Sequence, residues 1–202
     1  MSGAASVPRW RFGDDPTEIA AALAAGAILA IPTESSYGLA VDPRDAAAVE
    51  KVFALKGREA GKALPVVAAR PGQLATLGVD IGAPAVAWAR AFWPAALTVL
   101  APLREPIAAS GGLATLAVRI PGHAGLRELL AALGMPLTAT SANPSGEPPF
   151  VDPEPLERWL AGAGVATLLV DGGPLPGGAP STLVVWRNGK PDVLRAGRFA
   201  VA

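Results

Sequence analysis

Residues 27–38 of this chain read AILAIPTESSYG, and residues 56–62 read KGREAGK. The first segment is an apolar run that ends in a proline and hydroxyl-bearing side chains, which predicts a buried strand leading into a polar loop. The second segment places three cations within seven residues of a protein that holds only 17 Lys and Arg among 202 residues. Hydroxyl groups followed by fixed positive charge suit a phosphate-bearing small molecule.

Helices are expected to alternate with short apolar strands along most of the chain. The expected helices cover residues 15–26, 43–58, 71–77, 83–92, 123–133 and a segment that begins at 152–153. Asp14 or Asp15 is expected to cap the first of these helices, and Asp42-Pro43 is expected to start the second. The expected strands cover residues 27–31, 64–69, 97–101, 113–120, 136–140, 166–170, 181–186 and 192–195. The turn signal Asn188-Gly189 predicts that the last two strands form a hairpin. This alternation predicts an α/β fold with a twisted, largely parallel sheet, an antiparallel component and flanking helices.

The length of 202 residues fits one domain, and no linker divides residues 1–202. Polar clusters follow the expected strands 27–31, 113–120 and 136–140. Ligands of α/β sheets generally bind beyond strand ends, so these clusters are expected to converge on one site.

Composition excludes several classes of function. The formal net charge is zero, so any contact with nucleic acid must depend on a local patch rather than on a global field. The chain has no cysteine, which excludes disulfides, thiolate nucleophiles and cysteine-based zinc sites. The first ten residues lack the pattern of a secretion signal, and no apolar run is long enough to span a bilayer. We therefore expect a cytoplasmic protein without a membrane partner.

Two cation groups are the strongest candidates for anion binding. Lys56, Arg58 and Lys62 suit a carboxylate or polyphosphate, although cations at a helix C-terminus also arise simply because they complement the helix dipole. Arg119 lies at the end of an apolar strand and needs an anion or another acceptor, which is either a ligand or the partner of a structural salt bridge.

Other polar residues are weaker candidates, because each has an ordinary structural explanation. Thr33 belongs to a polar strand-to-loop turn, and Ser141 with Asn143 belongs to a turn after strand 136–140. Ser181 and Arg195 repeat the combination of a hydroxyl and a cation. The single histidine, His123, is expected to cap a helix, and one histidine cannot form a histidine-pair metal site. Standard phosphate-loop, dinucleotide and hydrolase-elbow motifs are absent, which favours positioning and electrostatic catalysis over a covalent intermediate.

Taken together, the motifs resemble the YrdC/TsaC family, the threonylcarbamoyl-AMP synthases, over about residues 15–197. The resemblance is carried by PTESSYGL at 32–39, LKxRxxxKxL at 55–64, FWPxxLT at 92–98, LAVRxP at 116–121, TSANxSG at 140–146, Ser181-Thr182 and LRxG at 194–197. Each motif is weak alone, whereas their order and spacing are specific.

The resemblance implies a YrdC-like fold and a nucleotidyltransferase that makes threonylcarbamoyl-AMP and pyrophosphate from L-threonine, bicarbonate and ATP. A downstream complex would then transfer the threonylcarbamoyl group to tRNA beside the anticodon. The resemblance implies that Thr33, Arg119 and Ser181 hold threonine. It implies a nucleotide site formed by Arg58, Lys62, Thr115, Ser141, Asn143 and Arg195. Lys56 and Arg58 would be catalytic, no protein metal site is implied, and Mg²⁺ is compatible with ATP as substrate.

The chain departs from the usual family pattern at several positions. Ser35-Ser36 replaces a Thr-Val pair, Ala63 stands where proline is usual, and Ala95-Ala96 replaces Gly-Pro. Longer relatives append a C-terminal domain that covers the site, so a lid is expected here from within the domain or its termini. Two other functions remain open: a carbamoyl-adenylate-forming module, and a non-catalytic RNA-binding module. For the enzyme itself, any direct RNA binding is expected to be weak.

Overall fold

The computed structural model describes residues 7–59 and 61–201, so part of the N-terminal stretch considered above lies outside the described residues. The helices there are α1 (Pro16–Ala24), α2 (Ala46–Lys56), α3 (Pro71–Thr76), α4 (Pro84–Ala89), α5 (Ala124–Leu133) and α6 (Pro153–Ala161), with a short 3-10 turn at Ala108–Ser110. The predicted helices are therefore present. The α/β class is confirmed, but the strands form two sheets rather than one.

The five-stranded sheet has the order β1-β9-β2-β3-β8. Its strands are β1 (Arg9–Arg11), β9 (Thr167–Asp171), β2 (Ile28–Pro32), β3 (Tyr37–Ala40) and β8 (Thr140–Ser141). β1, β9 and β2 run parallel, whereas β3 is antiparallel to both β2 and β8. The sequence did not indicate β1. It did not indicate β3 either, because residues 33–38 have the composition of a loop.

The six-stranded sheet has the order β11-β10-β5-β6-β4-β7. Its strands are β11 (Lys190–Arg195), β10 (Thr182–Arg187), β5 (Leu97–Pro102), β6 (Thr115–Arg119), β4 (Val66–Val67) and β7 (Leu137–Thr138). Parallel and antiparallel pairs alternate across it, so the antiparallel component is larger than expected. The hairpin predicted at Asn188-Gly189 is confirmed by the antiparallel β10–β11 pair.

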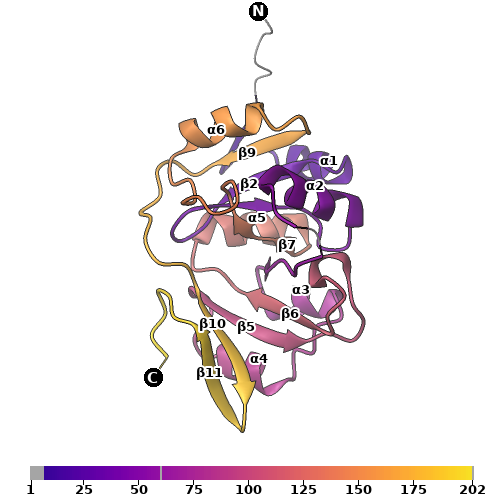
Figure 1. Ribbon diagram of the computed structural model, residues 1–202, viewed down its shortest axis with the longest axis vertical. Helices are drawn as coiled ribbons and strands as arrows, with labels where there is room; N and C mark the ends of the chain where they lie inside the picture. The colour runs from indigo at the N-terminus through magenta and orange to yellow at the C-terminus, as the bar shows by residue number, and fades with distance from the viewer. Residues whose placement is uncertain (1–6, 60, 202) are drawn as a thin grey trace, which may run out of the picture.

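The two sheets are joined where the chain passes from β7 to β8. The strand predicted over 136–140 is in fact two short strands in different sheets, and Ala139 between them donates its backbone N–H to the Pro65 carbonyl at 2.8 Å. In Figure 1 the five-stranded sheet with α1, α2 and α6 lies above the six-stranded sheet with α4, and residues 172–181 run down one side between them. Loops of both sheets can therefore contribute to one site.

Buried side chains cover both faces of the five-stranded sheet. One cluster packs Leu29 and Ile31 of β2 against α1 and α5. The other packs Ile28 and Ala30 against residues of α2 and α6, and it continues to the Val99 face of β5. β2 is buried on both faces for this reason, which agrees with its continuous apolar sequence.

Local capping groups fix where the helices begin. The Asp15 carboxylate accepts from the Thr17 backbone N–H at 2.9 Å, so Asp15 caps α1, one of the two caps that the sequence offered. Asp42 instead accepts from the Arg44 N–H in a turn, and Asp45 caps α2 through Ala48 at 3.0 Å. The second helix therefore begins three residues later than expected, because the Asp42 side chain stabilises a turn rather than the helix.

His123 caps α5 as predicted, because its Nδ1 accepts the Leu126 backbone N–H at 3.1 Å. This bond requires an unprotonated Nδ1. Burial lowers the pKa of His123 from its ordinary value of 6.5; Glu34 opposes the shift and Arg127 adds to it.

Lowering the pH should therefore weaken the folded state through His123. A folded-state pKa below 6.5 means that the contribution of His123 is present above that value and is lost as the pH falls through the folded pKa. In His123→Asn the side chain can cap the helix but does not titrate. Between pH 7.5 and 5 we therefore expect the free energy of unfolding of this variant to fall by about 1 kcal/mol less than that of the parent. Urea unfolding at both pH values measures this difference. His123→Ala, which lacks a cap at every pH, is the control, and equal pH dependence of parent and Asn variant would contradict the expectation.

Candidate functional site

The loop of the β2–β3 hairpin is held in a fixed turn. Both the backbone N–H and the Oγ1 of Thr33 donate to the Ser36 carbonyl, at 3.1 and 2.7 Å. Thr33 is buried, and its methyl group lies near Gly38, where an added Cβ would come within 3.1 Å of the Thr140 carbonyl. The Thr33 hydroxyl is thus already engaged, and β3 can approach β8 closely because residue 38 is glycine.

Glu34 in this loop pairs with Arg119 at the end of β6. The Oε2 atom of Glu34 lies 2.8 Å from Nη1 of Arg119, and Oε1 accepts the Gly122 backbone N–H at 2.7 Å. The two side chains are only 15% and 11% exposed. The structure therefore gives Arg119 a protein anion, which is the salt-bridge alternative considered for it, and identifies Glu34 as a site residue that the sequence did not indicate.

Arg119 is close enough to Arg195 for their charges to interact. Burial lowers the pKa of Arg119, Glu34 opposes this effect, and Arg195 adds to it. Arg195 donates through Nη2 to the Ser181 carbonyl at 2.9 Å, and the Ser181 hydroxyl lies 2.7 Å from that of Thr98 on β5. Arg119, Ser181 and Arg195 are thus neighbours, and Thr98 is a further polar group beside them.

Lys56 is the centre of a second cluster. It occupies the last turn of α2 and is 4% exposed, so it is not a solvated charge at a helix end. Its Nζ donates to Oδ1 and to the backbone carbonyl of Asn143, at 2.7 and 3.0 Å, and also to the Ser141 carbonyl. The Ser141 hydroxyl donates to the same Asn143 Oδ1 at 2.6 Å. Three of the predicted residues are therefore brought together.

The environment of Lys56 changes its basicity. Burial, and then the positive charge of Arg58, lower the pKa of Lys56 from 10.5 to about 8. Arg58 follows Gly57, which ends α2 in a left-handed conformation with φ of 60°. The turn at Gly57 directs the chain away from the helix, so that Arg58 remains partly exposed near the Lys56 ammonium group.

Two predicted residues lie further from these clusters. Lys62 is 53% exposed and is 3.6 Å from Glu59, an ion pair that contributes little at the surface. Thr115 shares the face of β6 that carries Arg119, but it lies four residues away, roughly 13 Å along the strand. It lines a hollow of about 270 Å³ together with Trp186 and Pro102.

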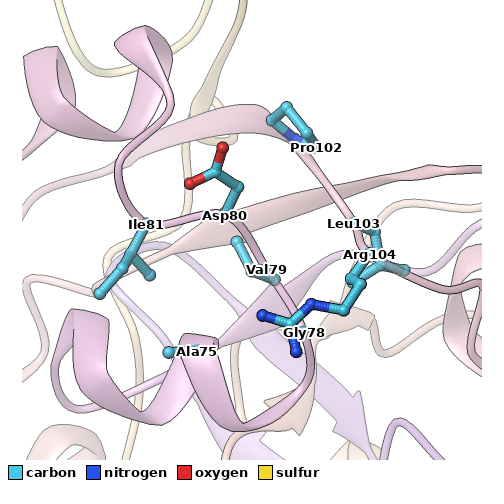
Figure 2. A pocket seen from close by; sticks show the side chains of 8 residues that line it. All are labelled: Ala75, Gly78, Val79, Asp80, Ile81, Pro102, Leu103 and Arg104. Carbon is cyan, nitrogen blue, oxygen red and sulfur yellow. The ribbon is translucent and has the colours of Figure 1, made fainter.

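A larger hollow of about 520 Å³ lies elsewhere, between residues 75–81 and 102–104. Figure 2 shows Asp80 and Arg104 among the side chains that line it. None of the predicted site residues is among its lining residues. The candidate site is therefore defined by converging loops rather than by this hollow.

The described residues 7–59 and 61–201 contain no group of three or more His, Cys, Asp or Glu side chains arranged to hold a metal ion. No helix in the same ranges is long and apolar enough to cross a membrane. The side chains brought together at the site are cations, hydroxyls, one amide and one carboxylate. Such a set can bind and orient anions and stabilise charge that develops on them.

Comparison with known proteins shows the family of the chain. The family model of the Sua5/YciO/YrdC domain, described as "Telomere recombination", matches residues 21–197. The chain belongs to the Sua5/YciO/YrdC family. It is 38% identical over 173 residues to a threonylcarbamoyl-AMP synthase of Thiobacillus denitrificans, a match that covers 85% of this chain and 89% of that protein.

Solved structures of the Sua5/YciO/YrdC family share the fold. Pyrococcus abyssi Sua5 in complex with L-threonine superposes with a TM-score of 0.80 at 32% identity, covering 95% of this chain and 57% of that one. Escherichia coli YciO, at 23% identity and a TM-score of 0.76, shows the fold alone, with 95% of each chain covered. The chain spans about half the length of the threonylcarbamoyl-AMP synthases of P. abyssi and Bacillus subtilis that it matches, at 51% and 54%.

The electrostatic link between Arg58 and Lys56 can be tested directly. Removing the positive charge in Arg58→Gln should raise the pKa of Lys56 above about 8, because Arg58 disfavours a second cation beside it. Arg58→Lys keeps the charge and should leave the pKa nearer to the parent value. NMR titration of protein labelled with ¹⁵N-lysine measures the pKa, and an equal pKa in all three proteins would show that the charges do not interact.

Proposed function

We propose that this chain is an L-threonylcarbamoyladenylate synthase, which forms threonylcarbamoyl-AMP and pyrophosphate from L-threonine, bicarbonate and ATP. The observation that carries the proposal is the 38% identity to the T. denitrificans threonylcarbamoyl-AMP synthase over 89% of that protein. The threonine complex of P. abyssi Sua5, which superposes on 95% of this chain, supports threonine as the amino acid.

The reaction brings together two anions that repel each other. The amine of threonine, once deprotonated, attacks carbon dioxide derived from bicarbonate and gives a carbamate and a proton. A carbamate oxygen then forms a bond to the α-phosphorus of ATP, and the bond to pyrophosphate breaks. Positioned cations accelerate such a step by holding the reactants in line and by neutralising charge on the transferring group.

The residues divide between the two substrates. Thr33, Arg119 and Ser181 would bind threonine; Thr33 lies in the hairpin loop, Arg119 ends β6 and Ser181 directly precedes β10. The nucleotide and its phosphates would be bound by Arg58, Lys62, Thr115, Ser141, Asn143 and Arg195. Lys56 and Arg58 would act as the catalytic cations between carbamate and phosphate. ATP would replace some of the present contacts of Lys56 when it binds.

The wider context follows from the product. Mg²⁺ would arrive coordinated to ATP phosphates, since it is commonly bound through substrate phosphates and the described residues offer no cluster of their own. The adenylate would pass to a tRNA-modifying complex that places threonylcarbamoyl on the adenosine beside the anticodon. A protein that supplies such a complex would act in the cytoplasm.

The activity is tested by measuring pyrophosphate release from ATP with threonine and bicarbonate present or omitted. We expect release to require both, and we expect Lys56→Met and Arg58→Gln each to lower the rate roughly 100-fold, because each removes a charge aimed at the transferring group. Arg44→Gln removes an exposed charge at the opposite end of α2 and should retain the parent rate.

Other outcomes of this assay would point to another function. Release with carbamoyl phosphate but not with threonine would identify a carbamoyl-adenylate-forming module instead. Tight RNA binding without any pyrophosphate release would identify a non-catalytic RNA-binding module.

A further inference from the structure

Glu34 is a carboxylate in a part of the site otherwise populated by cations. Each of its oxygens accepts one hydrogen bond, from Arg119 at 2.8 Å and from the Gly122 N–H at 2.7 Å. A carboxylate has about four lone-pair positions, so both oxygens can accept another donor. The Arg119 side chain is 11% exposed and meets Glu34 through Nη1, which leaves the N–H groups on its other nitrogens as possible donors to a ligand. Both members of the pair can therefore meet a ligand.

The pair is complementary to a free amino acid. Threonine carries its carboxylate and its ammonium group on the same carbon, so a protein that binds it needs an anion directly beside a cation. Arg119 and Glu34 are joined in this way, and the charges nearby are positive: Arg195 lowers the pKa of Arg119, and Arg198 reaches the Glu34 backbone. An ammonium group placed here without Glu34 would meet only like charges from these neighbours.

The carboxylate is held in place rather than free to swing. The Glu34 carbonyl accepts from Nη1 of Arg198 at 2.7 Å, and the next carbonyl, of Ser35, accepts from the Gly177 N–H at 2.8 Å. On the other side, a Cβ at residue 122 would lie 3.4 Å from Cγ of Glu34, so glycine there lets the side chain pack closely. A fixed carboxylate can distinguish an ammonium group from a neutral group because it does not have to reorganise.

From these contacts we propose that Glu34 binds the α-ammonium group of threonine while Arg119 binds its carboxylate. The inference rests on the proposed function and identifies Glu34 as a residue that determines specificity for an α-amino acid. The alternative is that Glu34 serves only to hold or occupy Arg119. The two roles differ in one measurable respect. Only in the first role does Glu34 make the binding affinity depend on the charge of the ligand's α-substituent.

The test compares L-threonine with its 2-hydroxy analogue, 2,3-dihydroxybutyrate, in which a neutral hydroxyl replaces the ammonium group. Binding of each is measured by calorimetry with an α,β-methylene ATP analogue present, so that no turnover occurs. The parent should bind threonine about 10- to 100-fold more tightly than the analogue, because the hydroxyl cannot pair with the Glu34 charge. Glu34→Gln should weaken threonine binding by a similar factor and leave the analogue within about threefold of its parent affinity.

Controls separate this role from a structural one. If Glu34 only holds Arg119, Glu34→Gln changes the affinity of both ligands alike, and the ratio between them stays as in the parent, which would overturn the inference. Glu128→Gln makes the same change at an exposed position of α5 and should alter neither affinity. If Glu34→Gln fails to fold, Glu34→Asp retains the charge and should keep a preference for threonine. A parent protein that binds both ligands equally would also overturn the inference.

Failure of the inference is distinguishable from failure of the proposed function. A parent that releases pyrophosphate with threonine, but whose ligand preference does not depend on Glu34, retains the function and loses only the inference. A parent that neither binds threonine nor uses it loses both.

Discussion

The contact between Arg119 and Glu34 constrains the way the two sheets meet. An arginine whose side chain is almost covered needs an acceptor, because an unpaired guanidinium would keep its full desolvation cost. The acceptor, Glu34, comes from the hairpin loop of the other sheet, so the ion pair ties that loop to the end of β6. The same loop carries Thr33 and is tied to the C-terminal segment through Arg198. Loss of the Arg119 guanidinium would therefore leave the Glu34 carboxylate without its partner and remove this link between the two sheets.

Local signals in the sequence predicted much of the fold. The apolar run of β2, the Asp15 and His123 caps and the Asn188-Gly189 turn each depend on residues within a few positions of one another, and each is present. The passage of the chain from one sheet to the other at residues 136–140 depends instead on strands that are distant in the sequence. Leu137 pairs with Val67 in one sheet, whereas Thr140 pairs with Leu39 in the other. No pattern within residues 136–140 predicts that they divide between two sheets, because the division depends on their pairing with β4 in one sheet and with β3 in the other.

The candidate site, like the fold, could be predicted from the sequence only in part. A cation within an apolar strand predicts that some anion lies nearby, and the structure supplies one. It does not predict which anion, because Glu34 belongs to a polar turn of ordinary composition, 85 residues away from Arg119. The Lys56 cluster could be inferred only through the family motifs, since Ser141 and Asn143 follow α2 by more than 80 residues. Strand β8 brings them to the end of that helix.

The role of Lys56 follows from the balance of forces on its ammonium group. With a pKa of about 8, the group is about nine-tenths protonated at pH 7, so it is a cation under ordinary conditions. Burial and Arg58 make that charge costly, and the oxygens of Ser141 and Asn143 compensate for part of the cost. An arriving phosphate or carbamate would favour the protonated form further, since an opposite charge raises the pKa of an amine. Lys56 is therefore best suited to stabilise anions by its charge, and the cost of holding it without an anion increases the gain when one binds.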